Sequence, residues 1–230
     1  HTLLPPGGAR NAQDCALWDL EAQRSGCPAW QAAGVIRPAP RLTTWTIGAD
    51  TPDSVAARAK EFAEARAIKL KLTGDGDDAD RIRAVRLARP EVWLGVDGNQ
   101  GFSRASLEAL MPVLVEANVA LFEQPLPRDR DADLDTLYSP ILLAADESVQ
   151  DLDDIPRAAG RFDVVNIKLD KCGGLTEALA MVEAAKAHGL GVMVGNMLGT
   201  SLAMAPAFII GQFCNIVELD GPVVLRCGRY

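Results

Sequence analysis

The sequence lacks the features that mark a membrane or secreted protein. No apolar run reaches the ~18 residues that a transmembrane helix requires. The first residues, His1 to Gly8, do not show the charged-then-apolar order of a signal peptide. We therefore predict a cytoplasmic protein with no membrane partner.

Histidine, paired cysteines and positive charge are also scarce. Two histidines occur, His1 and His188, so mechanisms that need a histidine base or several histidine ligands have few candidates. The five cysteines include no Cys-x-x-Cys pair, which favours reduced thiols over disulfides or a zinc site. Lys and Arg total 23 against 31 Asp and Glu, a net charge of −8. An acidic surface repels phosphate backbones, so we predict no nucleic-acid partner.

The chain does contain a regular alternation of short apolar runs and amphipathic segments from about Thr43 onward. The apolar runs predict strands at Thr43–Ile47, Ala67–Leu72, Val92–Val96, Ala120–Phe122, Ile141–Ala144, Val164–Ile167, Gly191–Val194 and Ile216–Leu219. The amphipathic segments predict helices at Pro52–Arg66, Asp78–Arg89, Ser103–Ala117, Asp131–Tyr138, Leu152–Ala159, Leu175–His188 and Thr200–Ile210. This order predicts an α/β fold with parallel strands, most economically a modified TIM barrel of the (β/α)7β type.

Residues 1–42 do not follow this alternation. Gly8–Ser25 predicts a helix whose apolar stripe must pack against the barrel or against material upstream. We expect a preceding segment to be absent from this sequence, because it opens without an initiating Met. The acidic run Asp75–Asp80 resembles a calcium loop only superficially, since it lacks the glutamate at the twelfth position, and predicts a solvated helix start.

Acidic residues follow three successive predicted strands, as Asp97, Glu123 and Asp146. In a parallel barrel the carboxyl ends of the strands meet at one mouth. Three carboxylates gathered there would repel one another unless a cation lay among them, and hard oxygen ligands suit Mg²⁺. The alternative is that each acid caps a helix or lies in a solvated loop.

Lysines occupy strand positions near the same mouth. Lys69 and Lys71 lie two apart on the second predicted strand, so they share a face while Leu70 points away. Lys168 ends the sixth strand, nearly opposite in a ring of eight. A lysine buried beside another cation loses its proton more readily and can act as a base. The alternative is a structural network in which these lysines pair with the acids.

These residue types suit the removal of a proton α to a carboxylate. A divalent ion can stabilise the enediolate that forms, as in enolase-superfamily sites. Two bases on opposite faces would remove and return the proton, and so would invert the stereocentre. One base would suffice for an elimination.

The motifs Lys69-x-Lys71, Asp97-x-Asn99, Glu123-Gln-Pro, Asp146-Glu-Ser and Asn166–Gly174 resemble the muconate-lactonizing-enzyme subgroup of the enolase superfamily. The resemblance covers nearly the whole chain. It implies Mg²⁺ on Asp97, Glu123 and Asp146, with Lys71 and Lys168 as the two acid/base residues. It also implies that residues 1–42 are the end of the family's capping domain and a linker, that residues 43–230 form the catalytic barrel, and that most of the capping domain and its lid are absent here.

Within that subgroup, two segments look like those of dipeptide epimerases: Glu218-Leu-Asp220-Gly-Pro, and Gly195–Ser201, which carries Asn196 and Met197. The resemblance implies a dipeptide substrate such as L-Ala-D/L-Glu, inverted at the Cα of its second residue, with Lys69, Asn196 and Met197 beside it. Glu218 and Asp220 lie two apart on the last strand, so both can face the mouth and bind a dipeptide's α-ammonium. We also expect a homo-oligomer.

Two other functions remain open at this point. A cycloisomerase or dehydratase resembling o-succinylbenzoate synthase would keep the scaffold and act on another carboxylate. A non-catalytic barrel would use the acids to hold a structural metal ion.

Overall fold

The computed structural model describes residues 4–224, and its eight strands are neighbours in one sheet in chain order. Pairing is parallel along β1 to β5 and between β7 and β8. The prediction of an α/β fold with parallel strands is confirmed. The strands are β1 (Trp45–Ile47), β2 (Ala67–Lys71), β3 (Trp93–Asp97), β4 (Leu121–Glu123), β5 (Leu142–Ala145), β6 (Val164–Ile167), β7 (Gly191–Val194) and β8 (Ile216–Val217).

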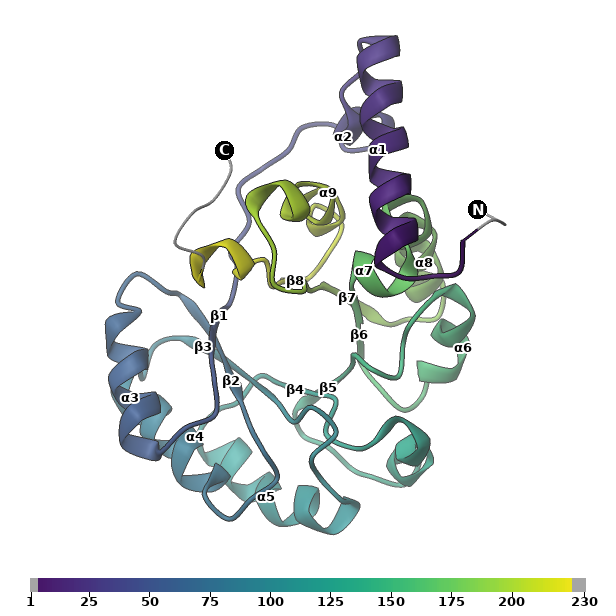
Figure 1. Cartoon of the computed structure of the whole chain (residues 1–230). Coiled ribbons are helices and arrows are strands. Elements are labelled where there is room, and N and C mark those ends of the chain that lie inside the picture. The colour runs from purple at the N-terminus through teal and green to yellow at the C-terminus, as the bar shows by residue number, and fades with distance from the viewer. Residues whose placement is uncertain (1–3, 225–230) are drawn as a thin grey trace. The chain divides into compact units, whose positions relative to one another are not determined.

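The chain forms two compact units, the first comprising Thr44–Ser148 with Gly160–Val164, and the second the rest of the described chain. In the first unit, helices α3 (Pro52–Glu61), α4 (Asp78–Ala88) and α5 (Arg104–Glu116) follow one another along one face of the strands, and a 3₁₀ helix η1 (Arg128–Leu134) follows β4 (Figure 1). The second unit contains α1 (Gly8–Ser25), α2 (Ala29–Ala32), η2 (Leu152–Asp154), α6 (Ile155–Ala158), α7 (Leu169–Cys172), α8 (Leu175–Ala187), α9 (Ser201–Gly211) and η3 (Gly221–Val224).

Local sequence explains where the helices of the first unit begin. The side chain of Thr51 accepts a hydrogen bond from the Ser54 amide, and Pro52 occupies the first helical position of α3. Ser103 and Ser106 form a reciprocal capping box at the start of α5. Strands β2 and β3 are buried on both faces, as parallel strands covered by helices should be.

Three predicted helices are shorter or different in kind. The predicted helix at Asp131–Tyr138 is wrong: the chain forms η1 and ends that helix at Leu134. The guanidinium of Arg104 donates hydrogen bonds to the carbonyl oxygens of Asp133 and Thr136, which a longer helix would use itself. In addition, aspartates favour local turns over helix interiors. The predicted helix at Leu152–Ala159 divides into η2 and the single turn α6. The helix predicted at Pro52–Arg66 ends at Glu61, because Phe62 turns inward and packs edge-on against Trp45.

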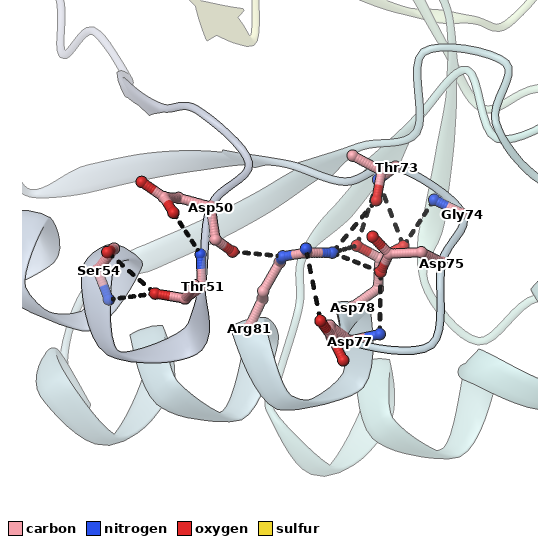
Figure 2. Close-up of polar contacts among 9 residues, drawn as sticks. All are labelled: Asp50, Thr51, Ser54, Thr73, Gly74, Asp75, Asp77, Asp78 and Arg81. Carbon is pink, nitrogen blue, oxygen red and sulfur yellow. Dashed lines mark hydrogen bonds and ion pairs between the residues drawn. The ribbon is translucent and has the colours of Figure 1, made fainter.

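The acidic run Asp75–Asp80, which leads into the first turn of α4, lies beside the buried Arg81 (Figure 2). Nη1 of Arg81 lies 2.6 Å from Oδ1 of Asp75 and 2.8 Å from Oδ1 of Asp78. The carboxylate of Asp78 also accepts from the amides of Thr73 and Gly74. The helix start is confirmed, but the expectation that the whole run is solvated is wrong, because Asp78 is buried. This network fixes the turn that follows β2, the strand that carries Lys69 and Lys71.

Helix α1 packs within its own unit, against α7 and α8. Nη2 of Arg10 lies 2.7 Å from Oε2 of Glu177, and Nδ2 of Asn11 donates to Oδ1 of Asp170 at 3.0 Å. Oδ2 of Asp14 accepts from the Thr176 amide at the start of α8, at 3.0 Å. The predicted helix at Gly8–Ser25 is therefore confirmed, and polar contacts from it brace the turn that follows α7. The expected packing of its apolar stripe is not confirmed, because Asp14 is the buried residue of the helix and Leu20 of the stripe is exposed.

The described residues contain no helix that is both long and apolar enough to cross a membrane. The four cysteines between residues 4 and 224 are free thiols, as predicted. Burial raises the pKa of Cys172 to about 11 and that of Cys214 to about 12, so these thiols are protonated at neutral pH. The terminal His1 and the fifth cysteine, Cys227, lie outside the described residues.

Candidate active site

The last residues of three neighbouring strands stand in one row of the sheet. The register pairs Lys71 of β2 with Asp97 of β3, and Asp97 with Glu123 of β4. Glu123 is in turn paired with Ala144 of β5, two residues before Asp146. The predicted meeting of these strand ends is therefore observed for Lys71, Asp97 and Glu123.

Both lysines of β2 reach the carboxylate of Asp97. Nζ of Lys71 lies 2.6 Å from Oδ2 of Asp97, and Nζ of Lys69 lies 3.2 Å from the same atom. Lys69 also lies 3.1 Å from Oε2 of Glu123. The intervening Leu70 is fully buried. The predicted shared face of the two lysines is confirmed.

The charges of the lysines decide the protonation of Asp97. Burial by itself would raise the pKa of this fully buried carboxyl. The ammonium groups of Lys69 and Lys71, together with hydrogen bonds from Lys71 and the Asn99 amide, outweigh that effect and hold the pKa of Asp97 below its usual range. Asp97 is therefore ionised at neutral pH.

Asp146 is placed by a different kind of contact. It is buried, and its backbone amide donates to Oε1 of Gln124 at 2.9 Å. Its neighbour Glu147 is half-buried, and burial followed by the charge of Asp146 raises the pKa of Glu147. Nδ2 of Asn99 reaches Oε1 of Glu147 at 3.5 Å.

Asp97 and Glu123 offer buried carboxylate oxygens, which are the type of ligand that Mg²⁺ prefers. Both carboxylates also lie close enough together to contact one cation, because the ammonium of Lys69 is within hydrogen-bonding distance of each. The chain from residue 4 to residue 224 nevertheless contains no group of three or more acidic, histidine or cysteine side chains arranged closely enough to hold an ion. The structure thus shows two of the predicted ligands meeting at one lysine, with Asp146 buried on the following strand end.

The second unit carries the remaining predicted residues. Lys168 is buried at the amino end of α7, close to Asn166 of β6. A β-carbon added to Gly195, which follows β7, would lie 2.9 Å from Cε of Lys168 and 2.6 Å from Oδ1 of Asn166. Gly195 therefore leaves the space that the lysine side chain fills.

Glu218 and Asp220 are both buried where β8 ends. Nδ2 of Asn196 donates to the carbonyl oxygen of Glu218 at 2.6 Å, so Asn196 supports the strand end that carries the acidic pair. The amide of Leu219 donates to Oγ1 of Thr43 at 2.8 Å. Met197, by contrast, exposes about half of its surface.

Sequence reasoning missed the contacts made by Gln124, whose side chain joins two strand ends. Its position between Glu123 and Pro125 was part of a motif, but only the structure shows that this amide is fully buried. The role of Asn196 as a support for β8 was missed for the same reason: it depends on a contact between distant segments.

Curated relatives of this chain include racemases and epimerases. Over 224 residues it is 40% identical to an L-Ala-D/L-Glu epimerase of Escherichia coli (strain K12), covering 97% of this chain and 70% of that protein. Over 226 residues it is 39% identical to an N-acetyl-D-glutamate racemase of Pseudoalteromonas sp, covering 98% and 71%.

Solved structures of similar proteins carry ions and dipeptides. One is an enolase family member from Agrobacterium tumefaciens with homology to dipeptide epimerases, solved with sodium and L-Ala-L-Glu. It is 44% identical, with a TM-score of 0.96, over 100% of this chain and 70% of that one. Another is a dipeptide epimerase from Methylococcus capsulatus in complex with Mg and L-Arg-D-Lys, 32% identical, with a TM-score of 0.89, over 96% and 66% of the two chains.

The family described as "Enolase C-terminal domain-like" matches residues 54–218, which include every predicted metal ligand and both predicted catalytic lysines. The identity to the curated relatives extends over almost the whole chain. This chain belongs to the enolase C-terminal domain-like family.

Proposed function

We propose that this protein epimerises a dipeptide at the Cα of its C-terminal residue, by 1,1-proton transfer between two lysines. The observation that carries the proposal is the row formed by Lys71, Asp97 and Glu123, in which a base candidate lies 2.6 Å from a buried carboxylate. Relatives and solved neighbours named as dipeptide epimerases support the same chemistry.

Asp97, Glu123 and Asp146 would hold Mg²⁺, the ion named in the Methylococcus capsulatus complex. When bound, Mg²⁺ supplies positive charge that stabilises the negative charge developing on the substrate carboxylate as the α-proton leaves. Lys69, which contacts both Asp97 and Glu123, would bind a substrate oxygen.

Lys71 and Lys168 would act as the two acid/base residues that remove and return the α-proton. One amine removes the α-proton from one side of the carbon, and the ammonium of the other returns a proton on the opposite side. Each lysine alternates between amine and ammonium in the two directions of the reaction, so neither is consumed. Inversion requires both, whereas exchange of the α-proton with solvent requires only one.

Glu218 and Asp220 would recognise the α-ammonium of the dipeptide, with Asn196 holding their strand end and Met197 lying beside the substrate. Charge-assisted hydrogen bonds of this kind contribute about 1.5–3 kcal/mol each. Both acids are buried at the end of β8, where a cationic partner would offset the cost of their burial.

The test is proton exchange in D₂O followed by ¹H NMR, with Mg²⁺ and a panel of dipeptides that includes L-Ala-L-Glu. We expect loss of the α-proton signal together with appearance of the second epimer. Lys71→Ala and Lys168→Ala should each stop inversion while one epimer still exchanges. No exchange with any dipeptide would overturn the proposal. Chelation that melts the fold, combined with unchanged exchange in both lysine variants, would instead indicate a structural metal ion.

A second candidate is racemisation of an N-acylated amino acid, which the 39% identity to an N-acetyl-D-glutamate racemase favours. Such a substrate has no α-ammonium, so the acidic pair on β8 would give it no attraction. Exchange with N-acetylglutamate but with no dipeptide would favour this candidate.

Four further features belong to the same proposal: closure of the sheet into a (β/α)7β barrel, residues 1–42 as the end of a capping domain, a cytoplasmic location and a homo-oligomer. The similarity to enolase-family structures supports the first two. Light scattering coupled to size-exclusion chromatography would measure the oligomeric state.

A further inference from the structure

Gln124 links the ends of three strands. It directly follows Glu123, is fully buried and has a φ of 35°, an unusual backbone conformation for a residue other than glycine. Its backbone amide donates to the carbonyl of Ala144 on β5 at 2.8 Å, and its carbonyl accepts from the Gln100 amide beyond β3 at 2.8 Å. The backbone of Gln124 therefore extends the sheet pattern just past the last residues of the strands.

Beyond the last paired residues of the strands, hydrogen bonds from the side chain of Gln124 take the place of backbone hydrogen bonds between strands. Its Oε1 accepts from the amide of Asp146 at 2.9 Å and from that of Ser148 at 3.1 Å. Its Nε2 donates to Oγ of Ser148 at 2.8 Å and to the carbonyl of Leu126 at 3.0 Å. One carboxamide thus binds the backbone of Asp146 and of Ser148 and also the loop that follows Gln124 itself.

This arrangement couples two acidic residues. Glu123 precedes Gln124 in the chain, and Asp146 is held by its carboxamide, so a shift of Gln124 changes the spacing of the two carboxylates. A buried amide with both its oxygen and its nitrogen engaged has little freedom to relax. Groups that orient metal-binding side chains in this way change metal affinity by about 10–100-fold when they are removed.

We propose that Gln124 is a positioning residue that sets the spacing of Glu123 and Asp146 for a divalent cation. The inference rests on the proposed function, because it takes these two carboxylates as Mg²⁺ ligands. Gln124 itself touches neither substrate nor metal in this role.

The experiment is Mg²⁺ titration by isothermal calorimetry on the metal-free protein, with thermal unfolding measured in the absence of Mg²⁺. Gln124→Met keeps the volume of the side chain and removes its polar atoms. We expect its Kd for Mg²⁺ to rise by about 10–100-fold. Ser148→Ala removes one of the four side-chain hydrogen bonds and should raise Kd by about fivefold. Gln100→Met is the control, since the side chain of Gln100 accepts from the Arg128 amide and does not contact Asp146.

A Gln124→Met variant that unfolds at a lower temperature yet binds Mg²⁺ with the wild-type Kd would overturn the inference, because its role would be structural alone. An equal loss of affinity in Gln100→Met would also overturn it. Should Gln124→Met not fold, the Kd of Ser148→Ala decides, and a wild-type value overturns the inference.

Wild-type protein that binds no Mg²⁺ overturns both this inference and the metal site of the proposed function. Tight Mg²⁺ binding without α-proton exchange would count against the epimerase proposal, and the Kd values of the variants would still decide the role of Gln124.

Discussion

Gly195 lies against the side chain of Lys168, so closely that an added β-carbon would be 2.9 Å from Cε of the lysine. Real β-carbons essentially never approach another atom this closely, so a β-carbon at this position would force the side chains of Lys168 and of Asn166, whose Oδ1 would be 2.6 Å away, to shift. Gly195→Ala should therefore displace the Lys168 amine and leave Lys71 in place. A misplacement of about 1 Å can cost roughly 100-fold in rate, so we expect a loss of up to about 100-fold in inversion.

Measuring α-proton exchange for each epimer separately distinguishes this steric effect from a general loss of folded, active protein. In D₂O, the epimer whose α-proton is removed by Lys71 should still exchange in Gly195→Ala, whereas the other epimer should exchange slowly. Gly76→Ala serves as a control, since an added β-carbon there meets nothing within 4 Å. Equal loss of exchange from both epimers would contradict the prediction.

The acidic pair on β8 allows a test of substrate class. Glu218→Gln and Asp220→Asn keep the size of each side chain and remove its charge, so binding of a dipeptide's α-ammonium should weaken by about 1.5–3 kcal/mol per charge, or roughly 10–150-fold in kcat/KM. Where the wild type also exchanges N-acetylglutamate, which has no ammonium, that exchange should not fall in the same variants. A loss of kcat/KM that is equal for the two substrates would indicate that Glu218 and Asp220 do not recognise the ammonium.

Strand periodicity predicted the part of the candidate site that depends on local geometry. The alternation across Lys69, Leu70 and Lys71 requires only the two-residue repeat of a strand, and both lysines do reach Asp97. Asp97 and Glu123 share a row because parallel strands of a regular sheet end together, which the positions of the apolar runs also predict. Each of these inferences uses residues within one strand or on neighbouring strands.

Contacts between side chains and distant backbone could not be predicted in this way. Nothing in the local sequence shows that the amide of Gln124 binds the backbone of Asp146. Likewise, aspartates before a helix are typical of an exposed helix start, and only the position of Arg81 shows that Asp78 is buried beneath it. The helix predicted at Asp131–Tyr138 was wrong for a related reason, since Arg104 of another helix donates to the carbonyl oxygens of Asp133, within η1, and of Thr136, just after it.

The pair formed by Asp75 and Arg81 predicts a pH dependence of stability. The hydrogen bond from Arg81, followed by those from Thr73 and the Asp77 amide, holds the pKa of Asp75 below its ordinary value of 3.8. A carboxyl whose pKa is lower in the folded protein stabilises the fold above the unfolded pKa, and this contribution is lost as the pH falls through the folded pKa. The free energy of unfolding of Asp75→Asn should therefore be below that of the wild type at pH 7, and the difference should shrink at low pH.

Urea unfolding between about pH 2 and pH 7 measures this difference. Asp80→Asn is the control, because Asp80 is an exposed partner of Arg83 at 3.4 Å and such pairs contribute little. A difference between wild type and Asp75→Asn that stays constant down to about pH 2 would refute the assignment of the stabilisation to the charge of Asp75.

Two glycines with nearly the same backbone conformation separate the effect of conformation from that of packing. Gly174 precedes α8 with φ 126° and ψ −177°, and Gly7 precedes α1 with φ 141° and ψ 178°. A β-carbon on Gly174 would lie 2.5 Å from Cβ of Asp14, the residue of α1 that accepts from the Thr176 amide, whereas one on Gly7 would meet nothing within 4 Å. Both alanine variants bear the conformational cost, and only Gly174→Ala also forces α1 away from α8.

Gly174→Ala should therefore lower the free energy of unfolding by about 1–3 kcal/mol more than Gly7→Ala does. Chemical denaturation of the two variants measures this excess, and equal losses would show that the contact between α1 and the turn before α8 yields without cost.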